Sequence, residues 1–379
     1  ALLPLVLERG YADCPDMTEL SKRLAALYGA ALSVDSTLNG ANRVLSVSVA
    51  GIKDAYALSG ENLTAEYAKI ALGVAFKPYL IEGVFDAQAV AIEKEQLKEL
   101  LEGEINEKRS YCVRQARRKF FGDAPAGIER NGYLEEVDDI TPEKLTQVFQ
   151  NMLQSAQIEV MVLGTGAEIV CAALLGELAS ICRIPAHLRL PAAMPRVEPQ
   201  EFAQPLDTVQ GKLCLLFTAG EIFKPEDLSA LRVAVALLGG TATSRLFINV
   251  REKKSLCYYC AASFTSLCGM LSIDSGIEHA NAAAAKQAIL NELSILCTGT
   301  ITAKEMEETK RSLISSLVAV EDSLMGIESW YFAEIARGSD KTPADVVHEI
   351  ACVTPDDVRR VLCAFTLSVS YLLTKEDAQ

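Results

Sequence analysis

The stretch that decides the interpretation of this chain is Ser244-Arg245-Leu246-Phe247, which continues to Arg251-Glu252-Lys253-Lys254-Ser255-Leu256-Cys257-Tyr258. It places Arg251 and Tyr258 seven residues apart, and we predict a short helix that turns into a strand between them. Arginine presents a rigid fork of donors and tyrosine adds one hydroxyl, so the two could hold the backbone carbonyls of an extended peptide. A structural alternative stays open, in which Arg251 pairs with Glu252 or another acid and Tyr258 packs in a core. Arg245 is interpreted as a structural anchor of the short helix.

The length and charge of the chain limit its class. A chain of 379 residues is too long for one compact core, so we expect two domains. The formal net charge of -14 argues against binding to nucleic acid or to an anionic membrane surface. No apolar run reaches the roughly 18 residues needed to span a bilayer, and none resembles the core of a signal peptide. We therefore expect a cytoplasmic protein that binds neither nucleic acid nor membrane.

The 11 cysteines are scattered and odd in number, which fits buried, reduced thiols better than a disulfide framework. Cys171 and Cys214, for example, lie in apolar runs. Cys257 and Cys260 form the only CxxC pair, and no second pair completes a zinc site. On a strand, alternation would direct these two thiols to opposite faces, so we do not expect a metal site here.

A weak internal duplication organises the chain. Residues 140–145 (Ile-Thr-Pro-Glu-Lys-Leu) recur as residues 353–358 (Val-Thr-Pro-Asp-Asp-Val), and in both copies threonine can cap a helix whose first turn holds proline. An apolar strand is predicted after each helix, at residues 158–163 and 367–373. The other predicted elements are two long helices (86–121 and from Thr302), two helices that end at glycine (16–29 and 225–238), and two alternating strands (44–49 and 271–277).

A proline-rich stretch separates the two halves. Residues 184–205 are predicted to be a linker, because prolines 191, 195, 199 and 205 fall in it without an apolar period. The expected fold class is α+β, with a first domain over residues 1–183 and a second over residues 206–379. Each domain is expected to be a sheet covered by helices on one side.

The arginine/tyrosine stretch, the duplication and the helix order together resemble the M16 (pitrilysin-like) zinc metallopeptidases, and the resemblance spans essentially the whole chain. It implies two similar M16-type domains, each a mainly antiparallel sheet covered by helices, joined by the Pro-rich linker. It also implies that Arg251 and Tyr258 bind substrate, beside a zinc ion carried elsewhere. The start of the chain resembles a bacterial branch of inactive family members.

The zinc motif of that family, His-x-x-Glu-His, is absent from this sequence. Counting back from Gly10 by the family's spacing places the motif at residues 1–5. There Ala1 and Leu5 replace the two histidines, and Pro4 replaces the general-base glutamate. None of these side chains can bind zinc or move a proton. We also expect the first domain to lack an N-terminal part of the family's fold.

No other residues supply the missing chemistry. The three histidines, His187, His279 and His348, are isolated from one another. The family's third ligand is a glutamate of the first long helix, where Glu93, Glu95 and Glu99 are expected to form a solvated face. There is no GxSxG, P-loop or GxGxxG motif. We therefore expect no catalytic residue, no metal ligand and no cofactor in this chain.

The resemblance thus implies a non-catalytic, substrate-binding subunit of a heterodimeric M16-like zinc peptidase. Zinc and the general base would come from a partner chain that carries His-x-x-Glu-His, and the substrate would be a peptide or an unfolded polypeptide. On its own the chain is not expected to be an enzyme. Two alternatives stay open: a structural scaffold without a peptidase role, and a peptide-binding homodimer.

Overall fold

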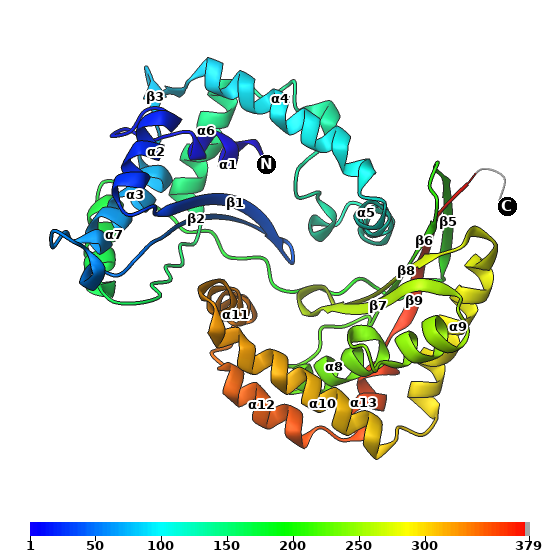
Figure 1. The fold of residues 1–379 in the computed structure, drawn as a ribbon. Helices are drawn as coiled ribbons and strands as arrows, with labels where there is room; N and C mark the ends of the chain where they lie inside the picture. Colours follow the sequence, from blue (N-terminus) through cyan, green and yellow to red (C-terminus); the bar gives the residue numbers. More distant parts are fainter. Residues whose placement is uncertain (376–379) are drawn as a thin grey trace. The chain divides into compact units, whose positions relative to one another are not determined.

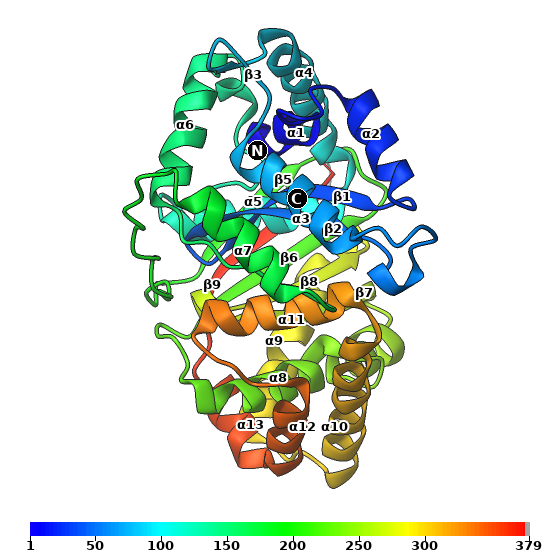
Figure 2. The same cartoon turned by 90° about the vertical axis from the view of Figure 1, so that its left-hand side faces the viewer.

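A computed structural model describes residues 1–375, and the chain divides into two compact units, whose elements are labelled in Figures 1 and 2. Unit 1 comprises Ala1–Gly103 and Ile128–Arg189, and unit 2 comprises Glu104–Gly127 and the chain from Leu190 onward. These units are defined by packing. The sequence domains 1–183 and 206–379 stay a prediction. The α+β class is confirmed, and the larger sheet is mainly antiparallel as predicted.

Unit 1 is mainly helical and contains two antiparallel hairpins. Its elements are α1 (Leu2–Glu8), α2 (Met17–Ala26), β1 (Ala31–Asn39), β2 (Asn42–Ala50), α3 (Leu63–Phe76), β3 (Leu80–Ile81), β4 (Val84–Phe85), α4 (Ala87–Gly103), α6 (Pro142–Ser155) and α7 (Ala167–Leu178). The longer hairpin pairs β1 with β2 from Ala31↔Ala50 to Asn39↔Asn42. Helices α1, α3 and α4 share one core, to which they contribute the buried residues Leu7, Ile70 and Val90.

Two predictions for the first half of the chain are wrong. Residues 158–163 were expected to be a strand, but they have no regular secondary structure and pair with no strand among residues 1–375. An apolar run forms a strand only where a neighbouring strand takes up its backbone hydrogen bonds. The long helix over residues 86–121 is interrupted, because α4 ends at Gly103 and α5 (Lys108–Phe121) begins after a short turn. Glycine is a poor helix former, which explains the position of the break.

Unit 2 is built around a five-stranded sheet of order β5-β9-β6-β8-β7, in which only the β5–β9 pair is parallel. Its strands are β5 (Gln200–Pro205), β6 (Gly211–Thr218), β7 (Cys257–Thr265), β8 (Met270–Ile277) and β9 (Thr366–Thr374). Besides α5, its helices are α8 (Leu228–Val235), the π-helical turns η6 (Ala236–Gly240) and η7 (Leu246–Lys253), α9 (Ala282–Thr298), α10 (Ala303–Val318), α11 (Leu324–Arg337), α12 (Pro343–Cys352) and α13 (Pro355–Leu362).

Helices cover both faces of this sheet, whereas the sequence predicted helices on one side only. Leu213, Leu215 and Phe217 of β6 belong to the core shared with α8, α9 and α13. Cys214 and Leu216, which alternate with them, belong to a second core on the opposite face, where α5 packs. The second layer was not predicted because the contacts of α5 with this sheet are distant in the sequence: Cys112 contacts Lys212 and Tyr371, which follow it by 100 and 259 residues. Figure 1 shows α5 beside the strands of unit 2.

Most other predicted elements are confirmed. The helix starts fit their capping residues: Thr141 caps α6, and Thr302 and Thr354 form capping boxes at α10 and α13. The predicted helices that the structure contains are α2, α6, α8 with η6, α10 and α13. The predicted strands that it contains are β2, β8 and β9. The prediction that residues 184–205 are a linker is wrong at its end, because residues 200–205 form β5 and pair in parallel with β9.

The cysteines are all free thiols, and six of them are buried. Cys214 is fully buried as predicted, but Cys171 is exposed because no residue of its helix, α7, is buried. Along the part of the chain that the structure describes, we found no helix with the length and apolar character needed to cross a membrane.

Candidate peptide-binding site

Arg251 and Tyr258 lie on either side of the tight junction that joins η7 to β7. Two backbone hydrogen bonds close this junction, from the Ser255 N–H to the Arg251 carbonyl (3.1 Å) and from the Leu256 N–H to the Val250 carbonyl (3.1 Å). Ser255 adopts a positive φ of 52°, a conformation that non-glycine residues adopt mainly at tight turns. The predicted change from short helix to strand is therefore confirmed, and it fixes the backbone that carries both side chains.

The Arg251 side chain is partly exposed and has only local partners. Its guanidinium lies over the Phe247 ring, 4.5 Å from the ring centroid, and its Nη1 is 3.3 Å from Oε1 of Glu252. The side chain of Arg251 remains 38% exposed. An exposed ion pair of this kind contributes little to stability, so a ligand can replace Glu252 at small energetic cost. The predicted pairing with Glu252 is thus present, yet it does not bury the arginine.

Tyr258 points away from the core, in contrast to the structural alternative. The residue is 48% exposed, and its hydroxyl donates to Oε1 of Glu278 at 3.3 Å. Partial burial and the carboxylate of Glu278 raise the pKa of the Tyr258 phenol above its ordinary value. A tyrosine hydroxyl is protonated at neutral pH even without this shift, so it can donate a hydrogen bond.

A β-bulge accounts for the direction of Tyr258. Cys257 pairs with Ile277 of β8 and Tyr259 pairs with Gly276, so Tyr258 is the extra residue between them. The bulge also places Cys257 and Cys260 in the same buried core, against the prediction of opposite faces. A hydrogen bond from the Cys260 thiol lowers the pKa of Cys257 to about 7.

Arg245 anchors the helical turn that leads to Arg251. Its Nε and Nη2 donate to the two carboxylate oxygens of Glu305 at 2.8 and 3.2 Å, and Nη2 also donates to the Thr300 carbonyl at 2.7 Å. Burial alone would raise the pKa of Glu305, but hydrogen bonds from Arg245 and Thr302 outweigh it and hold this pKa below its usual range. Arg245 is 8% exposed, so the structural role predicted for it agrees with its contacts.

The residues at which the sequence led us to expect the zinc motif form a packed helix. Leu3 and Pro4 of α1 are buried, and Leu5 packs against the same core. At the end of this helix, Nη1 of Arg9 pairs with Oε1 of Glu93 at 2.7 Å. Glu93 is only 4% exposed, so the prediction that it belongs to a solvated face is wrong. The sequence did not reveal this ion pair because 84 residues separate its members.

The donors for a metal site are not brought together. Among residues 1–375 no group of three or more histidine, cysteine or acidic side chains is arranged to hold a metal ion. His279 is satisfied by the Thr374 hydroxyl (3.0 Å) and the Thr208 carbonyl (3.1 Å). His187 and His348 are exposed and lie in other parts of the chain. The residues present therefore do not fit zinc.

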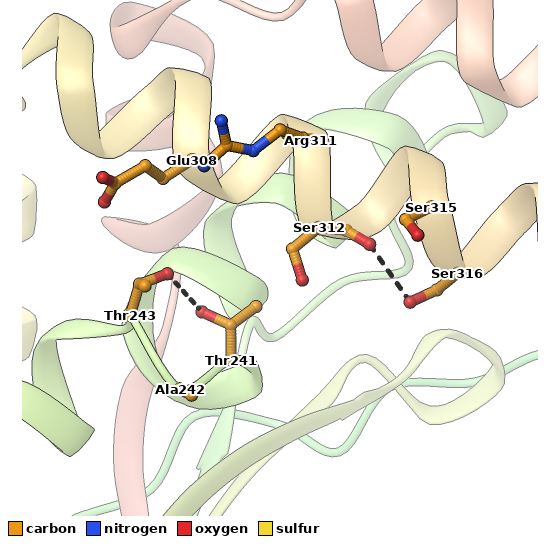
Figure 3. A pocket seen from close by; sticks show the side chains of 8 residues that line it. All are labelled: Thr241, Ala242, Thr243, Glu308, Arg311, Ser312, Ser315 and Ser316. Atoms are coloured by element: carbon orange, nitrogen blue, oxygen red, sulfur yellow. Dashed lines mark hydrogen bonds between the residues drawn. The ribbon is translucent and has the colours of Figure 1, made fainter.

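A hydroxyl-lined hollow in unit 2 was not predicted. Figure 3 shows this cavity of about 500 Å³ between α10 and the loop that follows η6; its lining residues are Thr241, Ala242, Thr243, Glu308, Arg311, Ser312, Ser315 and Ser316. The Thr241 and Thr243 hydroxyls share a hydrogen bond of 3.2 Å. The only sequence signal for the hollow was the run of serines at positions 312, 315 and 316, which share one face of a helix.

Comparisons with known proteins agree with this picture. A family model described as "Peptidase M16 inactive domain" matches residues 139–313. The chain is 28% identical over 374 residues to "Probable inactive metalloprotease YmfF" of Bacillus subtilis (strain 168), covering 98% of this chain and 88% of that protein. A conserved protein from Enterococcus faecalis V583 has a similar crystal structure, with a TM-score of 0.88 at 26% identity over 99% of this chain and 89% of that chain. A peptidase M16 inactive domain from Pseudomonas fluorescens has a TM-score of 0.74 at 17% identity, over 100% and 88% of the two chains.

The match to an inactive M16 domain and the match to a probable inactive metalloprotease support an inactive homologue of a metallopeptidase. These matches confirm the resemblance to the M16 (pitrilysin-like) family that the sequence predicted. Within that family it is similar to YmfF over nearly its whole length.

Proposed function

We propose that this chain is the non-catalytic, substrate-binding subunit of a heterodimeric M16-type zinc peptidase of the cytoplasm. Arg251 and Tyr258 bind the backbone of an extended peptide, and a partner chain with a His-x-x-Glu-His motif supplies zinc and the general base. The observation that carries the proposal is that both side chains are at least one-third exposed at one hydrogen-bonded junction, where their only polar side-chain partners in the described part of the chain are the exposed residues Glu252 and Glu278.

The chemistry of the two side chains suits a peptide backbone. A guanidinium is always charged at neutral pH and donates several hydrogen bonds, whereas the Tyr258 hydroxyl donates one. Both can therefore be directed at the carbonyl oxygens of an extended chain. A carbonyl that accepts a charged donor is polarised, and the same donor stabilises the oxyanion that forms when water attacks.

The position of β7 supports the same proposal. This strand stands at the end of the sheet, and no other strand pairs with its outer edge in the described part of the chain. An edge strand leaves backbone donors and acceptors unpaired, and extended peptides commonly bind by pairing with such an edge. Tyr258 lies at the start of this edge, next to the first residue of the strand.

The first test is affinity capture of this chain from its own cells, followed by mass spectrometry of the proteins that co-purify. Recovery of a similar-sized chain with a His-x-x-Glu-His motif, and zinc only in that chain, is the expected result. Recovery of a large assembly without such a chain would favour a scaffold. Recovery of this chain alone would favour a peptide-binding homodimer.

The second test uses the assembled complex. Arg251→Ala should lower kcat/KM for peptide cleavage by about 100-fold, the order expected for loss of a charged donor to the reacting carbonyl. The matched control is Arg311→Ala, which removes another exposed arginine of unit 2 and should leave cleavage unchanged. Size-exclusion chromatography checks that both variants still assemble. Unchanged cleavage by a verified Arg251→Ala complex would remove the substrate-binding role.

A further inference from the structure

Two cysteines meet where the ends of helices α9 and α13 come together. Cys297 is the last residue but one of α9, and Cys363 directly follows α13. The Cys363 thiol donates to the Cys297 carbonyl, with an Sγ to oxygen distance of 3.7 Å. A second contact joins the same helix ends, because Nε of Arg359 donates to the Gly299 carbonyl at 3.2 Å. The two cysteines are thus held together by the packing of the two helices.

The two thiols differ in their surroundings. Cys363 is exposed, whereas Cys297 is partly buried. Burial, followed by the hydrogen bond with the Cys363 thiol, raises the pKa of Cys297 to about 12. The pair therefore combines an accessible thiol with a second, less reactive thiol in direct contact with it. This is the arrangement in which an oxidised first thiol can be resolved by the second.

We propose that Cys297 and Cys363 are a reversible redox site, which forms an intramolecular disulfide when the protein meets a low-molecular-weight disulfide such as oxidised glutathione.

The reaction balances as a two-electron exchange. The Cys363 thiolate attacks one sulfur of oxidised glutathione, which forms a mixed disulfide and releases one glutathione thiolate. The Cys297 sulfur then attacks Sγ of Cys363, which forms the protein disulfide and releases the second glutathione. The two protons lost by the cysteine thiols end on the two glutathione thiolates. The protein thiols are oxidised and the glutathione disulfide is reduced.

The other thiol pair of unit 2 provides a natural comparison. Cys257 and Cys260 are 9% and 6% exposed, so an external disulfide has little access to either sulfur. Their thiols are already in hydrogen-bond contact, so access to an external disulfide is what separates this pair from Cys297 and Cys363. We therefore expect oxidation at Cys297 and Cys363 to precede oxidation at Cys257 and Cys260.

The disulfide would join α9 to α13, and α9 contacts the helical turn η7 of the candidate peptide-binding site. Helix α9 carries Glu292, which is 6% exposed and accepts a hydrogen bond of 2.9 Å from Nδ2 of Asn249 on η7. The same turn carries Arg251. A bond between Cys297 and Cys363 fastens the end of α9 to α13 and restricts the unfolded chain between them.

The test is to treat the reduced, full-length protein with oxidised glutathione and to map its disulfides by mass spectrometry of proteolytic peptides. The expected product joins the Cys297 and Cys363 peptides, raises Tm by about 5 °C, and reverts with dithiothreitol. Cys171, Cys182 and Cys352 are the other exposed cysteines among residues 1–375, and they should carry glutathione without forming this link. A stable glutathione adduct on Cys363 of the wild-type protein would overturn the proposal, as would earlier oxidation of Cys257 and Cys260.

Two variants separate the disulfide from other effects of oxidation. Cys297→Ser should leave Cys363 as a mixed disulfide and abolish the rise in Tm, whereas the control Cys352→Ser should keep both the link and the rise. The same rise in Cys297→Ser would show that another modification causes it. The peptide map of the wild-type protein decides the question even if Cys297→Ser does not fold.

Discussion

Helix α1 and the junction between η7 and β7 use their side chains in opposite ways. In α1, where the family's zinc motif would lie, five of the seven residues are buried: Leu2, Leu3, Pro4, Val6 and Leu7. At the junction, the side chains of Arg251 and Tyr258 are 38% and 48% exposed and touch only local partners. The side chains of α1 are therefore used for packing in the core, whereas those of Arg251 and Tyr258 are accessible to a ligand.

This difference separates side chains that the fold needs for packing from side chains that it does not. A zinc site needs several polar donors that converge on one point, whereas α1, where we expected the zinc motif, offers mainly hydrophobic contacts. The helix therefore still contributes to the core of unit 1. At the junction, by contrast, the fold needs only the backbone turn and the anchor Arg245, so Arg251 and Tyr258 are not required for packing. The difference predicts a graded series of effects on stability.

The largest effect is expected in α1. Leu7 is fully buried in the core of unit 1, so Leu7→Ala should lower the free energy of unfolding by about 3 kcal/mol through lost burial and a residual cavity. Leu5→Ala, the same substitution at a partly buried position of the same helix, should cost only about 1 kcal/mol. Urea unfolding followed by circular dichroism measures both. Equal costs for the two variants would contradict the packing role assigned to α1.

The next largest loss of stability is expected for Arg245, the buried anchor, and not for the exposed Arg251. Arg245→Ala removes the hydrogen bonds to Glu305 and to the Thr300 carbonyl, and it should lower the free energy of unfolding by about 2 kcal/mol. Arg251→Ala should change it by less than about 0.5 kcal/mol. Trp330 lies in the same unit and its fluorescence can follow unfolding by urea. A larger loss for Arg251→Ala than for Arg245→Ala would reverse the two roles.

The sequence predicted the structural features of both regions that depend on residues close together in the chain, such as helix caps and turns. Threonine caps and a following proline placed the starts of α6 and α13 correctly. The change from a short helix to a strand between Arg251 and Tyr258 was also predicted, and η7 and β7 confirm it. These features depend on residues only a few positions apart.

Features that depend on distant partners were not predictable in the same way. Residues 158–163 and 367–373 are both apolar and both follow a Thr-Pro helix, yet only the second forms a strand, between β5 and β6. The burial of Glu93 depends on Arg9, and the shared face of Cys257 and Cys260 depends on the bulged pairing with β8. In each case the deciding contact comes from a segment that no local pattern identifies.

A smaller effect on α1 depends on pH. Partial burial, followed by the charges of Glu93 and Asp35, raises the pKa of Glu8 above its usual value. The unfolded chain therefore loses this proton at lower pH than the folded chain, so stability falls as pH rises through the window between the two pKa values. Glu8→Gln should raise the free energy of unfolding by about 0.5 kcal/mol at pH 7, a value kept small by the exposure of the side chain.

The gain should disappear on acidification. Below the ordinary range of glutamate, at about pH 3, both states of the wild-type protein hold the proton and the glutamine offers no advantage. Urea unfolding at both pH values measures the difference. A Glu8→Gln variant that is less stable than the wild type at pH 7 would show that the carboxylate of Glu8 is favourably paired.

The smallest effect on stability is expected at Tyr258, where the effect on binding should be clear. Tyr258→Phe keeps the ring and removes an exposed hydroxyl, so the free energy of unfolding should stay within about 0.5 kcal/mol of the wild-type value. The lost donor should weaken binding of fluorescein-labelled, unfolded casein peptides by about 5-fold, as measured by fluorescence anisotropy. Tyr331→Phe, at another exposed tyrosine of unit 2, is the matched control and should bind normally. If both variants bind alike, the Tyr258 hydroxyl does not contact the peptide, and exposure at the junction does not by itself mark a binding residue.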